Sequence, residues 1–227
     1  MPRETFDREL GQLEAEVVLM SGMVENAIFS SLAALAARDL DRSQEVIDED
    51  DRIDDKENDI EAACIEIIRR EAPIASDLRR IIAVLHIAGE LERIGDYAEG
   101  IGKISLMMGS QPPLKKLVDI PRMGEIAVSM LKRSLEAYLE RDPKAVEDKA
   151  RGLGPDDDAV DALYKHVQDE LIEMMKRNPD YVERATYLLW VAHNLERVAD
   201  RATNIAEQAL YQATGRNVNI GQPEHVV

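Results

Sequence analysis

Two stretches of the chain repeat one another: Leu91–Ala98 reads LERIGDYA, and Leu195–Ala202 reads LERVADRA, 104 positions later. Each stretch belongs to an apolar seam with alternating spacings of three and four residues, which places the apolar side chains on one face of an α-helix. The first seam is Val84, Ile87, Leu91, Ile94, Ala98 and Ile101, and the second is Leu188, Val191, Leu195, Val198, Ala202 and Ile205. We expect both stretches to be core helices of one repeated unit.

A second, shorter repeat lies upstream of each seam. Asp50–Asp54 reads DDRID, and Asp157–Asp161 reads DDAVD, 107 positions later. The two offsets differ because Gly152–Pro155 looks like an inserted turn. Two matches in the same order indicate a tandem duplication, and each copy has room for three helices.

The rest of the chain reads as helix broken by proline and glycine. Long runs rich in Ala, Leu, Met and Glu favour helix, and Pro73, Gly109–Pro113, Asp142–Pro143 and Asn178–Pro179 interrupt them. The expected fold is all-α, with two tandem, pseudo-symmetric three-helix bundles. The six helices are expected near 4–38, 42–70, 76–108, 120–140, 157–177 and 180–214. We divide the chain into a first unit at 1–110, a linker at 111–119, a second unit at 120–215 and a flexible tail at 216–227.

Composition excludes several classes of protein. The 227 residues include 28 Lys and Arg against 45 Asp and Glu, and the formal net charge of −17 disfavours binding to nucleic acid. A single cysteine, Cys64, rules out an intrachain disulfide and a cysteine-based zinc site. The longest uncharged run, Asn26–Ala37, is too short to cross a bilayer, and the first ten residues lack an apolar signal region. We expect a soluble, cytoplasmic protein.

Part of the negative charge is arranged in pairs. Residues four positions apart lie on one face of a helix, so each pair presents two carboxylates side by side. A cation between them would remove their repulsion, and oxygen ligands suit Mg²⁺, Ca²⁺, Mn²⁺ or oxidised iron, with Zn²⁺ as a further candidate. Asp51, Asn58 and Glu99, or Asp158, Asn204 and Glu207, are possible additional ligands. The predicted metal ligands are Asp50, Asp54, Glu92 and Asp96 in the first unit and Asp157, Asp161, Glu196 and Asp200 in the second.

Other readings of these acids stay open. Acidic pairs at this spacing are often only a solvated helix face, and the chain would then be a purely structural, dimerising helical protein. A metal-storage or metalloenzyme bundle of the ferritin type would need Glu-x-x-His motifs, but none of the four histidines has an acid three residues earlier. No pattern typical of a nucleophilic catalytic site is present, so we expect no enzyme activity.

The repeated segments resemble the PhoU family, whose members are accessory proteins of bacterial phosphate transport and signalling. The resemblance is carried by Asp77–Ala98 and His193–Glu207, with a weaker match at Val160–Tyr164, and it spans nearly the whole chain in the same order. It implies two symmetric three-helix bundles, each with a surface that binds metal clusters through acidic pairs. These motifs map onto the eight carboxylates above.

The resemblance also implies a function and partners. PhoU proteins are negative regulators of the phosphate-starvation response and are thought to act between the ATPase PstB of the phosphate ABC transporter and the sensor histidine kinase PhoR. We therefore expect contact with both, a homodimer, and membrane association only through partners. One departure concerns the frequent Gly-Asp-His of the family, because Tyr97 and Arg201 stand where the histidines would be. No imidazole from that position is expected at either acidic pair.

Overall fold

The computed structural model describes residues 3–220, which form helices joined by short connections, with no strand among them. The predicted all-α fold is confirmed. The elements are α1 (Arg3–Ala37), α2 (Leu40–Glu71), α3 (Ala75–Met108), α4 (Asp119–Leu139), α5 (Pro143–Arg151), α6 (Gly154–Arg177), the 3-10 turn η1 (Pro179–Tyr181) and α7 (Val182–Thr214).

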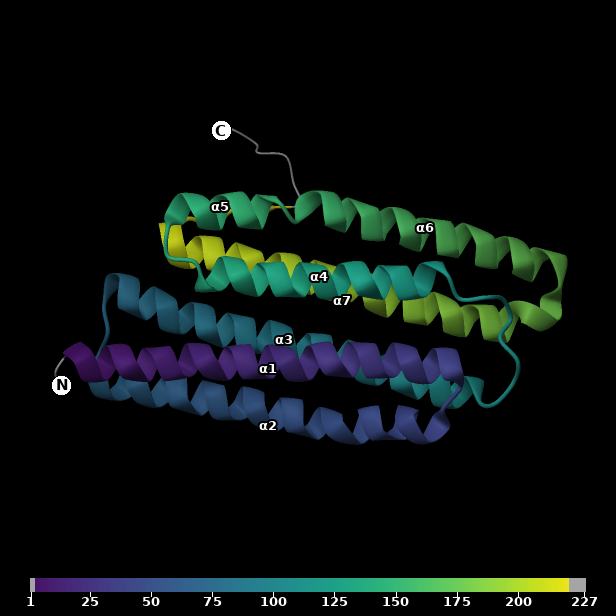
Figure 1. Cartoon of the computed structure of the whole chain (residues 1–227), viewed down its shortest axis with the longest axis horizontal. Helices are drawn as coiled ribbons and strands as arrows, with labels where there is room; N and C mark the ends of the chain where they lie inside the picture. Colours follow the sequence, from purple (N-terminus) through teal and green to yellow (C-terminus); the bar gives the residue numbers. More distant parts are fainter. Residues whose placement is uncertain (1–2, 221–227) are drawn as a thin grey trace.

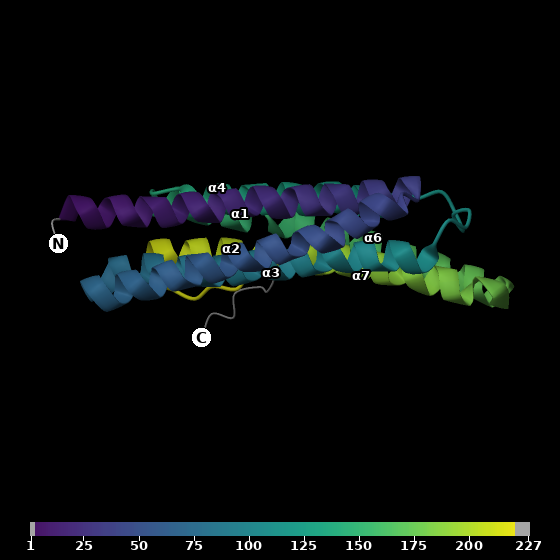
Figure 2. The same cartoon turned by 90° about the horizontal axis from the view of Figure 1, so that it is seen from below.

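The helices form two three-helix bundles side by side. Figure 1 shows α1, α2 and α3 in one half of the molecule and α4 to α7 in the other half, with all long helices nearly parallel to the long axis. Seen from below in Figure 2, α1 and α4 lie in one layer, and α2, α3 and α7 lie in the opposite layer. The halves meet where α3 packs on α7 and α1 packs on α4. The two predicted three-helix units are therefore present.

Aspartates cap the N-termini of α2 and α5, and a glycine ends α7. The Asp39 side chain accepts a hydrogen bond from the backbone N–H of Arg42 at 3.0 Å, and Asp142 accepts one from Ala145 at 2.9 Å. Such bonds satisfy donors that have no partner within the helix. Gly215 has φ +73° and ends α7 in the left-handed conformation that glycine adopts without strain.

The helix before Gly152 is the main difference from the sequence analysis. We predicted a helix only from residue 157, but α5 already begins at Pro143, and α5 and α6 lie end to end as one interrupted rod in Figure 1. Asp142–Pro143 caps α5 and starts it, so these residues were wrongly read as a loop alone. Arg133 of α4 fixes the interruption, because it donates to the Gly152 carbonyl at 2.6 Å and pairs with Asp156.

The two predicted apolar seams form the centre of the fold. Every residue of both seams is at most 1% exposed. A fully buried aliphatic side chain contributes roughly 1.5–3 kcal/mol relative to an exposed one. The seams therefore fix α3 and α7, and with them the faces that carry Glu92, Asp96, Glu196 and Asp200.

A buried carboxylate joins the halves at one end of the molecule by pairing with two arginines that are more exposed. Glu14 of α1 is 7% exposed and contacts two arginines, with Arg80 Nη2 at 2.8 Å and Arg141 Nη2 at 2.6 Å. Arg80 belongs to α3, whereas Arg141 follows α4. One carboxylate thus connects the first unit to the second.

By length and composition alone, helix α1 could cross a membrane, although none of its uncharged runs is long enough to span a bilayer. The stretch Glu4–Ala37 contains an 18-residue window of mean hydropathy 1.5, and half of that window is buried inside the bundle. Core helices of soluble proteins can be equally long and apolar. The packing of α1 on α2, α3 and α4 accounts for its composition.

The segment after α7 turns back onto the bundle. Val218 and Ile220 pack against the core, and the Ile220 backbone N–H donates to Glu207 Oε1 at 2.8 Å. The tail predicted at 216–227 is thus attached over 216–220, and residues 221–227 lie outside the described part of the chain.

Leu91→Ala tests the seam. Leu91 is fully buried in the first seam, so its truncation is expected to lower the free energy of unfolding by about 2–5 kcal/mol. Leu139→Ala is the matched control, because Leu139 is 41% exposed and its loss should cost less than about 1 kcal/mol. Urea unfolding measures both values, and equal losses would contradict this account of the core.

Candidate metal centre

The first unit brings its predicted carboxylates together. Helix α2 supplies Asp50 and Asp54, and helix α3 supplies Glu92, Asp96 and Glu99, which we call the first acidic site. Ligand atoms of Asp50, Asp96 and Glu99 lie within 4.8 Å of one another, and the same holds for Asp54, Glu92 and Asp96. Asp96 belongs to both groups, so the site offers two adjacent cation positions that share one carboxylate.

One of these acids, Asp50, is buried, and a second, Asp54, is half-buried with one buried oxygen. Asp50 is 8% exposed and makes no hydrogen bond or ion pair with any described residue. Asp54 Oδ1 is also buried and has no hydrogen-bond partner. Buried carboxylates in proteins are normally paired with a donor or a cation, because an unpaired one is costly. The first acidic site therefore has the chemistry of a cation site.

Gly95 allows the two helices to approach at this point. A Cβ atom there would lie 3.0 Å from Asp50 Oδ1 and 3.1 Å from Ile53 Cγ2. The missing side chain leaves space in which the Asp50 carboxylate lies against α3. The corresponding residue of the second unit is Ala199, which has a Cβ in that place.

The first acidic site resists ionisation as it stands. Burial, followed by the negative charges of Glu99, Asp54 and Asp96, raises the pKa of Asp50 to about 7. Burial and neighbouring acids also raise the pKa of Glu92 and of Asp96. A bound cation would reverse this effect, because it favours the charged form of each ligand.

The second unit arranges its four predicted ligands differently. Asp157 and Asp161 come from α6, and Glu196 and Asp200 come from α7; we call them the second acidic site. Arg197 Nη1 contacts Asp200 Oδ2 at 2.9 Å, so this carboxylate already has a cation. Among the described residues, no three acids of the second site meet within the distance that the first site satisfies.

The surroundings of the second acidic site are also partly basic. Asp157 and Asp200 line a surface hollow together with Arg197 and Arg201. Burial, followed by the charges of Asp161 and Asp200, raises the pKa of Asp157 to about 6. The His193 side chain, which is largely exposed, lies 3.4 Å from Glu196 Oε2. The second site is thus a mixed ionic surface. In the first site Lys103 Nζ contacts Glu99 Oε1 at 2.5 Å, whereas Asp50, Asp54, Glu92 and Asp96 make no ion pair with a described residue.

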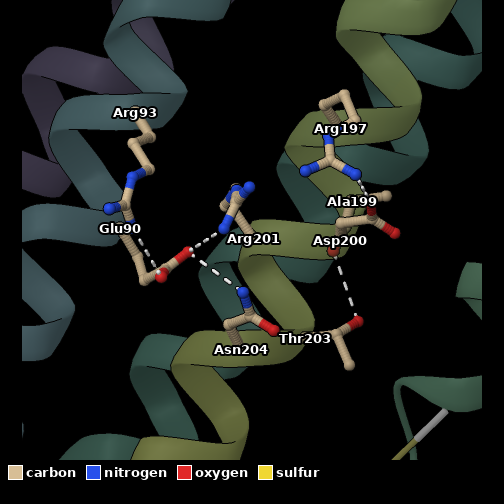
Figure 3. Close-up of polar contacts among 8 residues, drawn as sticks. All are labelled: Glu90, Arg93, Arg197, Ala199, Asp200, Arg201, Thr203 and Asn204. Atoms are coloured by element: carbon tan, nitrogen blue, oxygen red, sulfur yellow. Dashed lines mark hydrogen bonds and ion pairs between the residues drawn. The ribbon is translucent and has the colours of Figure 1, made fainter.

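Sequence reasoning missed Glu90, which lies between the two acidic sites. Figure 3 shows its carboxylate facing three side chains. Arg93 Nη1 donates to Glu90 Oε1 at 3.1 Å, and from α7 Arg201 Nη1 and Asn204 Nδ2 donate to Oε2 at 3.3 and 3.2 Å. The available signal was its position immediately before the repeated Leu-Glu-Arg, where the second copy has Asn194.

A third group of possible ligands lies away from both sites. Asp119, His166 and Glu170 have ligand atoms within 4.8 Å of one another. Lys115 already pairs with Glu170, and the His166 side chain is 68% exposed. An internal cation thus occupies part of this group.

Comparison with known proteins identifies the family. The model of the PhoU domain matches twice, at residues 17–105 and 120–209. The chain belongs to the PhoU family. Its two matches correspond to the two three-helix units.

Similar proteins cover almost the whole chain. A protein of Clostridium acetobutylicum named phosphate-specific transport system accessory protein PhoU homolog is 36% identical, over 97% of this chain and 99% of that one. The crystal structure of PhoU from Pseudomonas aeruginosa is 31% identical and superposes with a TM-score of 0.86, covering 93% of this chain and 100% of that one. That of the phosphate transport system regulatory protein PhoU from Streptococcus pneumoniae is 30% identical, with a TM-score of 0.82 over 94% and 99% of the two chains.

The raised pKa of Asp50 predicts how stability depends on pH. The folded protein binds the proton of the Asp50 carboxyl more tightly than the unfolded chain does, because aspartates of the unfolded chain titrate near 3.8. The contribution of this proton to the free energy of unfolding is therefore complete below about pH 4 and is lost as the pH rises to about 7. In the presence of a chelator, the free energy of unfolding should fall over this range. In Asp50→Asn, the free energy of unfolding should fall less steeply with pH at the upper end of this range. Urea unfolding between about pH 5 and pH 8 measures it, and equal slopes for both proteins would contradict the assignment.

Gly95→Ala tests the close approach of α2 and α3. The new methyl group would press on Asp50 and Ile53, so we expect weaker metal binding and a lower free energy of unfolding by about 1–3 kcal/mol. Gly89→Ala in the same helix is the control, because nothing lies within 4 Å of its Cβ position. That change should stabilise the helix by roughly 0.5–1 kcal/mol. Thermal unfolding and Mn²⁺ titration measure the two effects, and similar results for both variants would overturn the role of Gly95.

Proposed function

We propose that this PhoU protein is a cytoplasmic regulator of phosphate uptake that binds metal ions at the first acidic site and acts by contact with other proteins. Its similar relatives are named for the phosphate-specific transport system, which supports the process. The observation that carries the metal part is the buried, unpartnered Asp50 beside Asp54 and Asp96. No catalytic step is proposed.

The residues present fit hard metal ions at the first acidic site. All candidate ligands are carboxylate oxygens, which suit Mg²⁺, Mn²⁺, Ca²⁺ and oxidised iron, whereas Zn²⁺ usually takes nitrogen or sulfur ligands as well. Asp50 and Asp54 would hold the ions from α2, and Glu92, Asp96 and Glu99 would hold them from α3. The second acidic site fits metal less well, because Arg197 contacts Asp200, one of its four predicted ligands, whereas in the first site Lys103 contacts only the additional ligand Glu99.

Bound ions would supply positive charge to a strongly negative face. Without them, the carboxylates of α2 and α3 repel an acidic partner and one another. With their ligands neutralised, the same helices present a nearly neutral surface to a partner. Metal binding would in this way decide whether the protein docks.

The partners in this proposal are the ATPase PstB of the phosphate ABC transporter and the sensor histidine kinase PhoR. Contact with them would restrain the phosphate-starvation response and would bring the protein to the membrane only through its partners. We also propose a homodimer, and no nucleic-acid partner in view of the net charge of −17. The proposed units are 1–110 and 120–215, joined by a linker at 111–119.

A double variant tests the function in cells that lack their own copy of the protein. Asp50→Asn/Asp96→Asn should leave a phosphate-starvation reporter active in high phosphate and should lose co-purification with the ATPase, because the metal ligands are gone. Asp55→Asn/Asp59→Asn is the control with the same change of charge, since both residues are exposed on α2 outside the site. It should behave as the wild type. Full repression by the first variant would contradict the proposal.

A further inference from the structure

The acidic pairs of α3 and α7 each have an arginine between their two acids, at the same place in the repeat. Arg93 stands three residues before Asp96, and Arg197 stands three residues before Asp200. Residues three apart are neighbours on a helix surface, so either arginine can reach the following aspartate. Each can equally reach back to the residue three positions before it. In both repeats, the arginine can therefore contact either the residue three positions before it or the aspartate three positions after it.

The two arginines take opposite directions. Arg93 turns back and contacts Glu90 Oε1 at 3.1 Å. Arg197 turns forward and contacts Asp200 Oδ2 at 2.9 Å. Figure 3 shows both contacts, with Glu90 on the far side from Asp200.

The residue three positions before each arginine explains the difference. In the first repeat it is Glu90, a carboxylate that attracts Arg93 away from Asp96. In the second repeat it is Asn194, which carries no charge and instead donates from Nδ2 to the backbone oxygen of Tyr97 at 3.4 Å. Arg197 thus has a negative partner only in the forward direction on its own helix.

Glu90 also holds an arginine of the second repeat. Its side chain is 13% exposed, and that of Arg201 is 18% exposed, with 3.3 Å between Arg201 Nη1 and Glu90 Oε2. Asn204 donates to the same oxygen at 3.2 Å. One carboxylate therefore binds one arginine of α3 and one arginine of α7, and neither arginine makes an ion pair with Asp96.

We propose that Glu90 is a positioning residue that keeps Arg93 out of the first acidic site. In the second acidic site, the neutral Asn194 leaves Arg197 free to pair with Asp200. The chain then binds metal ions at the first acidic site alone, although both repeats carry the acidic pairs. The inference rests on the proposed metal binding at the first site. It goes beyond that proposal because it names the residues that make the two sites unequal.

Titration with Mn²⁺ alone, followed by the electron paramagnetic resonance of the free ion, tests whether Glu90 keeps Arg93 out of the first acidic site. Glu90→Gln should weaken Mn²⁺ binding by roughly three- to tenfold, because Arg93 is released towards Asp96. Glu90→Gln/Arg93→Gln should restore the wild-type affinity. Glu90→Gln/Arg52→Gln is the matched control, since it removes an exposed arginine of α2 and the same charge, and it should restore little.

The role of Asn194 and Arg197 is tested by variants that should gain Mn²⁺ binding at the second acidic site. Asn194→Glu should draw Arg197 back from Asp200 and add Mn²⁺ sites to the chain. Arg197→Gln should add them too, because it removes the competing cation. Adding Asp200→Asn to either variant should remove the extra ions and leave those of the first site.

The outcomes separate this inference from the proposed function. If the wild type binds Mn²⁺ but Glu90→Gln binds equally well, or its loss is not recovered without Arg93, the positioning role is wrong and the metal function stands. Loss of half of the wild-type Mn²⁺ on Asp157→Asn/Asp200→Asn would also overturn the inference alone. A wild type that binds no Mn²⁺ would overturn both.

Discussion

The close approach of α2 and α3 at Gly95 is the constraint on which the candidate site depends. It confines carboxylates from two helices to a small, partly buried space, where burial and then their mutual repulsion raise the pKa of several of them. Hydrophobic packing of the seam beneath supplies the energy that holds these charges together. The fold thereby keeps an arrangement that is unfavourable until a cation joins it.

The same fold is used twice, but with different consequences for the charges. In the first unit Gly95 makes room for Asp50, and Glu90 collects two arginines; in the second unit Ala199 and Asn194 stand at these places. The backbones repeat, whereas the ionic contacts do not. A duplicated fold can in this way carry different ionic contacts on its two copies.

The fold could be predicted from sequence to a large extent, because apolar spacing, proline and glycine are local signals. The two seams and most helix ends are confirmed, and α5 was missed because Asp142–Pro143 marks either a loop or a helix start. The pairs at 50 and 54 and at 92 and 96 do meet, and the recurrence of the motif at a fixed spacing carried that prediction. The direction in which Arg93 and Arg197 turn depends on three-dimensional competition between partners, which the identical Leu-Glu-Arg motifs cannot reveal.

The central claim is that metal binding is confined to the carboxylates of α2 and α3. An anomalous difference map from a crystal grown with Mn²⁺ tests it most directly, since it places each ion. The account predicts peaks between Asp50, Asp54 and Asp96, and none between Asp157 and Asp200. Peaks of equal height at both places, or peaks only in the second unit, would contradict it.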